Sequence, residues 1–180
     1  MILEYSLEAQ DYLTHQLFLA SINDRIKAKR KRGRIIVPAF YLVIAFLFYD
    51  PEHIGYTVMI GVLAVLWLLF YPLYETKRYI KHYEAFILEN HKSNFGKPNH
   101  LEIQEDHLFA RDRTSEAKVS LQEIQSIYEL PAHYLVRLGS AQSFILPKKQ
   151  VDESELKTAL ERIAQQLSIT IQDYRSWRWK

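Results

Sequence analysis

Metal or acid–base chemistry in this chain would have to come from its 7 histidines and its carboxylates. His100 and His107 lie on either side of an expected tight hairpin, where their side chains could approach each other. The sequence has no HExxH spacing and no cysteine, so it lacks the usual zinc-ligand patterns. We therefore expect no metal site and interpret the histidines on strands as facing solvent. Surface charge, rather than an acid–base pair, is our interpretation of the carboxylates Glu102, Glu105, Asp106 and Asp112.

Phosphate-binding and nucleophilic motifs are also absent from the sequence. There is no GxGxxG, P-loop or GxSxG pattern, and the 5 glycines leave little chain for a phosphate-binding loop. The absence of cysteine also excludes disulfides and a cysteine nucleophile. We expect no catalytic residues and no cofactor, and therefore a protein that is not an enzyme.

The densest charge in the chain is a basic segment, RIKAKRKRGR, at residues 25–34. Near a membrane surface each basic residue attracts anionic lipid headgroups by about 1 kcal/mol. A second interpretation is a flank that only orients the chain in the membrane, and the two are compatible. Nucleic-acid binding is disfavoured, because a segment that abuts an uncharged one meets lipid phosphates first. The expected headgroup-binding residues are Lys27, Lys29, Arg30, Lys31, Arg32 and Arg34.

A second candidate binding site is the pair Lys148 and Lys149, which follows an expected strand. This pair could bind a ligand or a partner protein, or it could be a solvated turn between strand and helix. The other basic residues considered for the same site are Arg111, Arg113 and Arg137. At the C-terminal end, YRSWRWK alternates aromatic and basic side chains, so it could enter the membrane interface or pack on the domain.

Two uncharged segments, residues 35–49 and 54–74, determine whether the candidate binding residues lie at a membrane or in a soluble protein. The second has the roughly 20 apolar residues that a membrane-spanning helix needs. The first has about 15, equivalent to about 22 Å, and flanking Arg and Lys side chains can extend its reach. Neither segment has the polar face of a helix in a soluble domain. We predict a two-helix transmembrane hairpin, with a buried soluble core as the alternative.

The distribution of charge predicts how this hairpin is oriented. The basic segment precedes the first span, and Lys77, Arg78 and Lys81 follow the second. The turn between the spans contains Asp50 and Glu52 but no Lys or Arg. Because basic flanks are retained in the cytoplasm, we expect a multi-pass protein with both termini cytoplasmic.

The remaining elements follow from caps and periodicity. One helix is expected from a Ser6 cap through the basic segment, and another continues the second span to about residue 94. From residue 99, short stretches with period two predict about six strands in a small antiparallel sheet or barrel. A helix capped by Asp152 or Ser154 follows. The expected parts are a cytosolic strand and helix with a basic flank (1–34), the hairpin (35–74), a juxtamembrane helix and linker (75–98) and a cytosolic domain (99–180).

The order of these parts resembles the YcxB-like family of bacterial membrane proteins. The specific motif is a hydrophobic strand, a proline–basic pair and a helix, here FILPKK at residues 144–149 and the helix from Glu153. The resemblance implies a bacterial cytoplasmic (inner) membrane protein with a pleckstrin-homology-like (PH-like) cytosolic domain. It implies no established activity.

The expected strands after residue 99 leave an open sheet edge, which is an aggregation liability. By the predicted topology, the strand-like ILEYS segment lies on the same side of the membrane. We therefore predict that Met1–Ser6 joins the C-terminal sheet. The fold class is expected to be α+β, with a transmembrane hairpin and a small PH-like sheet or barrel capped by a C-terminal helix.

The expected function is a membrane-anchored, noncatalytic binding or scaffold module that presents the PH-like domain to the cytosol. The expected partners are anionic membrane lipids, a protein that the sequence does not identify, and a second copy in a homo-oligomer, but no nucleic acid. The alternatives are a membrane immunity protein that neutralises a toxin and, less favoured, a membrane-surface enzyme.

Overall fold

The computed structural model describes residues 1–112 and 115–180, so Arg113 of the basic residues considered above lies outside the described residues. The chain forms two compact units. The first, here called the sheet unit, comprises Met1–His15 and Phe86–Arg178. The second, here called the hairpin unit, comprises Gln16–Ala85 and Trp179–Lys180.

The first sheet of the sheet unit has four antiparallel strands in the order β1-β2-β3-β4. The turn after β2 falls at Glu105–Asp106, between His100 and His107 as expected, and the Asp106 carbonyl accepts a backbone hydrogen bond from Leu121. The strands are β1 (Ile2–Ser6), β2 (Pro98–Ile103), β3 (His107–Arg111) and β4 (Glu116–Ser120).

Strand β1 confirms that the N-terminal segment joins the C-terminal sheet. It pairs with β2 from Ile2 opposite Glu102 to Ser6 opposite Pro98. Leu3 lies opposite Leu101, and the two side chains are 3% and 2% exposed. The pairing covers one edge of β2 with hydrogen bonds and adds apolar burial, so two distant parts of the chain fold as one sheet.

The second sheet has the order β7-β6-β5-β8. Strand β8 pairs with β5 in parallel, whereas the other pairs are antiparallel. The α+β class is confirmed, but the expected small antiparallel sheet or barrel is corrected to two small sheets, one with a parallel pair. Alternation cannot show strand direction, and here a helix between β7 and β8 returns the chain parallel to β5. The strands are β5 (Ile124–Glu129), β6 (His133–Leu138), β7 (Ser143–Pro147) and β8 (Ile171–Asp173).

Helix α4 (Glu153–Gln166) begins where its cap predicts. The Asp152 carboxylate accepts hydrogen bonds from the backbone N–H groups of Ser154 and Glu155, which would otherwise lack intrahelical partners. Its buried side chains are Leu156, Leu160, Ile163 and Ala164. Three 3₁₀ turns complete the unit: η1 (Lys92–Asn94), η2 (Leu121–Glu123) and η3 (Lys148–Gln150).

The single N-terminal helix expected from the sequence is wrong, because the chain forms α1 (Ala9–Ile22) and α2 (Asp24–Leu47). Asn23 separates them in an extended conformation, and its side chain caps α2 by accepting a hydrogen bond from Ile26 N–H. The expected Ser6 cap is also wrong. Ser6 is the last residue of β1, where its N–H donates to the Gln150 side chain.

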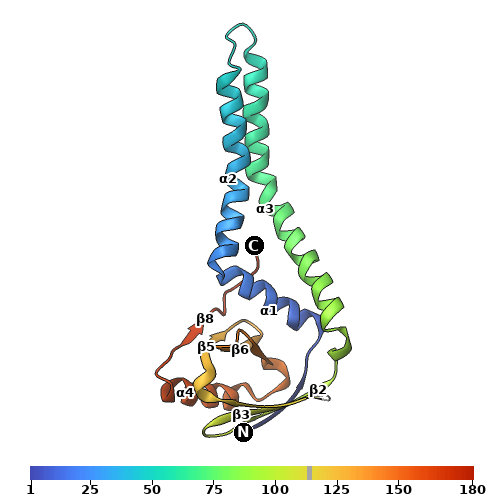
Figure 1. Cartoon of the computed structure of the whole chain (residues 1–180), viewed down its shortest axis with the longest axis vertical. Helices are drawn as coiled ribbons and strands as arrows, with labels where there is room; N and C mark the ends of the chain where they lie inside the picture. Colours follow the sequence, from blue (N-terminus) through green and yellow to red (C-terminus); the bar gives the residue numbers. More distant parts are fainter. Residues whose placement is uncertain (113–114) are drawn as a thin grey trace. The chain divides into compact units, whose positions relative to one another are not determined.

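Helices α2 and α3 (Ile54–Asn90) form an antiparallel hairpin within the hairpin unit, joined by the turn around Pro51 (Figure 1). Pro38 and Pro72 lie inside these helices. Ala45 and Ala64 are 9% and 4% exposed, as expected for small residues that allow close helix approach. Nearer the other end, a Cβ on Gly33 would overlap the Tyr71 hydroxyl, so a larger residue there would require the Tyr71 side chain to shift.

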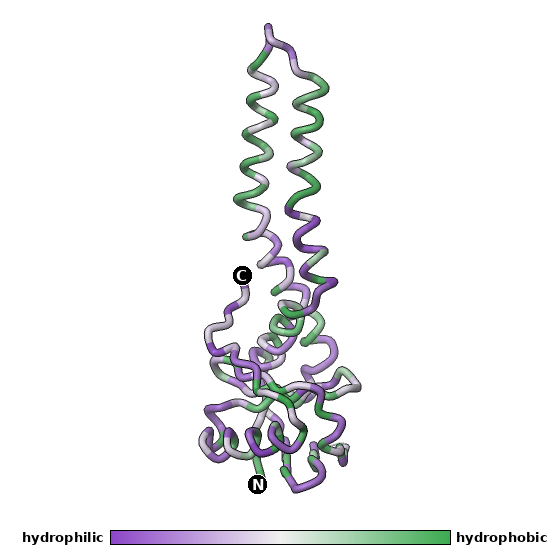
Figure 2. Tube along the Cα trace, turned by 90° about the vertical axis from the view of Figure 1, so that its left-hand side faces the viewer, coloured by the Kyte–Doolittle hydropathy of each residue, from purple (hydrophilic) through white to green (hydrophobic). Residues whose placement is uncertain are grey.

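Most of the exposed large apolar side chains lie on the hairpin. In Figure 2 the parts of its two helices near the turn are coloured mainly as hydrophobic. Helix α3 is the one helix among the described residues that is long and apolar enough to cross a membrane, and only 6% of its apolar window is buried. In α2 the apolar residues fill only the part that follows the basic segment. Length and composition therefore support one span, and the second span stays a prediction.

We expect Leu3→Ala to lower the free energy of unfolding of the sheet unit by about 2–4 kcal/mol, because it leaves a cavity opposite Leu101. The measurement is urea unfolding of the full chain in detergent micelles, followed by Trp177 fluorescence with Trp67 and Trp179 replaced by Phe. Ile2→Ala is the matched control, since Ile2 is 62% exposed and its loss should change stability by about 0.5 kcal/mol at most. Equal effects of the two substitutions would contradict the β1–β2 core contact.

Candidate binding sites

The basic segment lies on the N-terminal half of α2, next to the apolar residues of the same helix. Lys27 forms an exposed ion pair with Asp24 at 3.2 Å. The other exposed cations of the segment have no ion-pair partner among the described residues, so their charge is available to anionic groups outside the protein. They are Arg25, Lys29, Lys31, Arg32 and Arg34.

Arg30 differs from its neighbours because its hydrogen-bonding groups point into the hairpin unit. Its Nε donates to the Glu75 carboxylate at 3.1 Å, and its guanidinium donates to the Lys180 carbonyl at 2.6 Å. The same guanidinium lies 4.6 Å from the ring centroid of Trp179. The side chain of Glu75 is only 6% exposed, so the pair is largely desolvated and depends on both partners. Of the predicted headgroup-binding residues, Arg30 is thus already engaged.

The contact between Arg30 and Trp179 also shows how the end of the aromatic-basic tail is packed. Trp179 lies against Tyr79 of α3, with ring centroids 5.7 Å apart, in addition to its contact with Arg30. Of the two interpretations of the tail, the structure shows packing for Trp179 and the Lys180 backbone.

The structure separates the two lysines of the second predicted site. Lys148 is 8% exposed and forms ion pairs with Glu129 at 2.8 Å and Glu153 at 3.0 Å. Its ammonium group also lies 4.6 Å from the Tyr134 ring centroid. Burial opposes its charge, but the two carboxylates outweigh burial and raise the pKa of Lys148. Lys148 therefore joins β7 to β5 and α4.

Lys149 is exposed and lines a pocket of the sheet unit with a volume of about 370 Å³. It has no ion-pair partner among the residues that the structure describes. One wall of the pocket comes from α1, a second from the turn into β6, and a third from the residues after β7, with Trp177 adding an aromatic surface. The lining residues are Gln10, Asp11, Thr14, Pro131, Ala132, His133, Pro147, Lys149, Gln150 and Trp177.

Asp11 and His133 form a hydrogen-bonded pair in the wall of this pocket, with Asp11 Oδ1 and His133 Nε2 2.7 Å apart. The second carboxylate oxygen of Asp11 accepts a hydrogen bond from Glu8 N–H at 2.8 Å. Burial opposes ionisation of Asp11, but the hydrogen bonds from His133 and Glu8 outweigh it and lower the pKa of this carboxyl group. The pair fixes α1 against the start of β6.

This arrangement contains no evident nucleophile among the described residues. Thr14, the hydroxyl residue of the pocket wall, donates to the Gln10 carbonyl at 2.8 Å. His133 Nδ1 is buried without a hydrogen-bond partner. A pocket with an exposed cation, amide groups and an indole ring is better suited to binding a polar partner than to covalent chemistry.

The expectation that histidines on strands face solvent is wrong. His133 is 6% exposed, and the side chains of His100 and His107 are 22% and 12% exposed. His100 and His107 also have different partners: His100 lies 3.6 Å from Glu4, and His107 lies 2.5 Å from Asp106. Distant segments supply the partners of two of these histidines, β1 for His100 and α1 for His133, which alternation within a strand does not reveal. Among the described residues, no group of three or more potential ligands could hold a metal ion.

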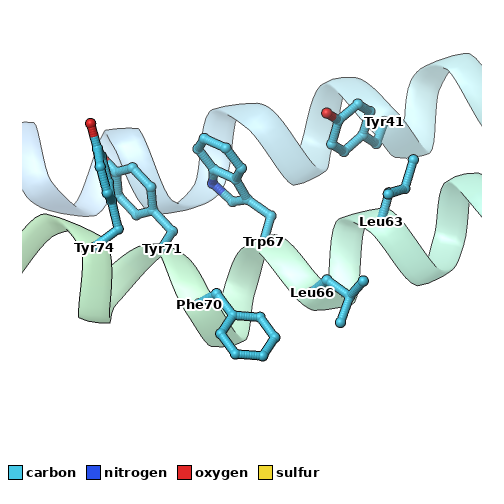
Figure 3. Close-up of a pocket in the computed structure, with 7 residues that line it drawn as sticks. All are labelled: Tyr41, Leu63, Leu66, Trp67, Phe70, Tyr71 and Tyr74. Carbon is cyan, nitrogen blue, oxygen red and sulfur yellow. The ribbon is translucent and has the colours of Figure 1, made fainter.

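The hairpin unit has an aromatic groove with a volume of about 560 Å³ (Figure 3). Tyr41 contributes from α2, and the other side chains come from α3, where Trp67 and Tyr71 stack with ring centroids 4.8 Å apart. Trp67 Nε1–H donates to the Gly33 carbonyl at 3.4 Å, which ties the groove wall to α2. The lining residues are Tyr41, Leu63, Leu66, Trp67, Phe70, Tyr71 and Tyr74.

Together, these observations define an α+β protein with two small sheets and, among the described residues, one helix long and apolar enough to cross a membrane. Residues 103–160 match the family model described as YcxB-like protein, from the end of β2 into α4. The predicted resemblance is confirmed over this segment, which includes the FILPKK motif. No curated protein matches the chain, and neither does any solved structure.

Several site residues escaped sequence reasoning because their partners are distant in the chain. Asp11 and His133 are 122 positions apart, and Arg30 and Lys180 are 150 apart. The aromatic residues Trp67, Phe70, Tyr71 and Tyr74 of the second apolar segment line the groove of the hairpin unit. Their spacing of three and four residues was the available signal that they also share one face of α3.

His15 generates a testable pH dependence in the sheet unit. Burial, followed by the charges of His91, Arg137 and His133, lowers its pKa to about 4, whereas an unfolded histidine titrates near about 6.5. The unfolded chain therefore binds this proton first as the pH falls, so stability decreases from about pH 6.5 toward pH 4. We expect His15 to account for a loss of roughly 2–3 kcal/mol between pH 7.5 and 4.5.

The measurement is the urea midpoint of the full chain against pH, with the Trp177 readout. His15→Leu should flatten the curve between pH 7.5 and 4.5, although His91, whose pKa is also lowered by burial, retains a smaller slope of the same sign. His82→Leu is the matched control, because His82 is exposed on α3. An unchanged slope in His15→Leu would show that His15 is not buried in its neutral form.

Proposed function

We propose that the chain is a noncatalytic binding module anchored in the bacterial cytoplasmic membrane by α2 and α3, with both termini in the cytoplasm. The observation that carries the proposal is the continuous apolar exposure of the hairpin. On α2, Phe40 and Phe46 are 61% and 82% exposed, and on α3, Leu69 and Leu73 are both 63% exposed. Apolar patches much larger than a few hundred Å² are rare on soluble monomers and mark membrane or protein contacts.

The hairpin geometry supports two spans, because α2 and α3 run antiparallel side by side (Figures 1 and 2). The short apolar part of α2 can span with local thinning of the bilayer and with its basic residues extended toward the interface. Acidic Asp50 and Glu52 lie at the turn, whereas the basic segment and Lys77, Arg78 and Lys81 lie beyond the other ends of the two apolar segments. This asymmetry favours an external turn.

The sheet unit supports the binding role. Two small sheets with the helix α4 before the last strand agree with a PH-like domain, in which β1 supplies a strand from before the hairpin. We propose that the pocket beside Lys149 binds a protein partner through an acidic group, because Lys149 is exposed there and its neighbour Lys148 is neutralised by Glu129 and Glu153. The ion pairs of the buried Lys148 side chain hold the loop that presents Lys149.

Reporter fusions test the anchor and its orientation. A reporter that is active only outside the cytoplasm should be active when inserted after Glu52 and inactive at either terminus. A cytoplasmic reporter should give the reverse pattern at the same positions. Activity of the external reporter at one terminus only would indicate a single span, and full inversion would overturn the orientation.

Charge reversal at the pocket tests the binding role. Lys149→Glu should deplete the proteins that co-purify with the chain from native membranes in mild detergent, because it places a carboxylate where an acidic group is expected. Lys157→Glu is the matched control, since it makes the same charge change on an exposed position of α4. Quantitative mass spectrometry compares the two with the native chain, and equal depletion by both would count against a pocket-specific partner.

A further inference from the structure

The aromatic groove of the hairpin unit is about as long as the hydrocarbon part of one bilayer leaflet is thick. Its lining on α3 runs from Leu63 to Tyr74, which corresponds to about 16 Å along a helix. Half of a hydrocarbon core about 30 Å thick is about 15 Å. The groove is therefore long enough for the part of one acyl chain that lies in a single leaflet, and aromatic and leucine side chains line it.

Cations lie at one end of this groove on both helices. On α3, the Arg78 guanidinium lies 5.9 Å from the ring centroid of Tyr74, which lines the groove. On α2, Arg34 is seven residues from Tyr41, about two helical turns, so the two share one face. Gly33 is in contact with Tyr71, so Arg34 lies at the level of the groove's aromatic end.

These two cations are not neutralised by the protein. Arg34 and Arg78 are exposed and have no ion-pair partner among the described residues. The nearest buried carboxylate on α3 at this level, Glu75, is already paired with Arg30. The groove thus combines an apolar channel with uncompensated positive charge at one end, which is the complement of a lipid with an anionic headgroup.

We propose that this groove binds one anionic phospholipid of the cytoplasmic leaflet. One acyl chain lies along Tyr41, Trp67 and Phe70, and the phosphate group is held by Arg34 with Arg78 beside it. The site rests on the proposed membrane anchor and adds to it a defined lipid position. Binding at this site differs from general attraction of anionic lipids to the basic segment, because only cations on the same helix face as the groove contribute to it.

Trp67 is a fluorescent probe within the groove. The full chain, with Trp177 and Trp179 replaced by Phe, is reconstituted into phosphatidylcholine vesicles. The vesicles contain the same minor fraction of either acyl-brominated phosphatidylglycerol or acyl-brominated phosphatidylcholine, and bromine quenches Trp67 on contact. We expect brominated phosphatidylglycerol to occupy the groove preferentially, by roughly fivefold in relative binding constant for each contributing cation.

Matched substitutions separate the groove from the surrounding charge. Arg34→Gln should reduce the preference roughly fivefold. Arg32→Gln removes the same charge nine residues from Tyr41, on the opposite face of α2, and should leave most of the preference intact. Phe70→Ala should weaken quenching by the anionic lipid, whereas Leu69→Ala, an equally exposed residue that does not line the groove, should not.

The other possible outcomes would overturn the proposed lipid site, each for a different reason. Equal quenching by the two lipids, or equal effects of Arg34→Gln and Arg32→Gln, would show general attraction without a groove site. No quenching by either lipid in vesicle-bound protein would mean that protein, such as a second copy, covers the groove. Failure of the chain to float with vesicles would overturn the membrane anchor, and the lipid site with it, whereas flotation without selectivity overturns the lipid site alone.

Discussion

Removal of apolar helix surface from water is the constraint on which the rest of the structure depends. In the hairpin unit, Ala45 and Ala64 are buried and Gly33 lies beside the Tyr71 hydroxyl, whereas most of the large aliphatic side chains of α2 and α3 are exposed. In the proposed membrane anchor, lipid covers these exposed side chains, and the helices satisfy their own backbone groups.

Several charged side chains form close ion pairs or hydrogen bonds within each unit. Arg30 and Glu75 join α2 to α3 at the basic end of the hairpin, and Trp179 covers the guanidinium. In the sheet unit, Lys148 is enclosed by Glu129 and Glu153, and Asp11 by His133 and Glu8. Arg30, Lys148 and Asp11 are thus paired within the protein, whereas the exposed cations Lys149 and Arg34 can act on other molecules.

The strand β1 explains how a chain interrupted by a long hairpin still makes a complete domain. Its partner β2 is almost a hundred residues further on, and the pairing buries Leu3 against Leu101. The family match at residues 103–160 covers neither β1 nor the hairpin. The first sheet, which contains matched residues, therefore gains its strand β1 from outside the match.

The sequence by itself determined the local features: the strands from β1 to β7, a helix cap at Asp152 or Ser154, the apolar segments, the basic segment and the FILPKK motif. Periodicity, caps and charge are properties of neighbouring residues, so they can be read without a fold. Only the tertiary structure decided that Asn23 divides the first helix, that β8 lies parallel to β5, that Lys148 is enclosed while Lys149 is exposed, and that His133 meets Asp11. These outcomes depend on which distant segments cover a given side chain, and no local pattern encodes that.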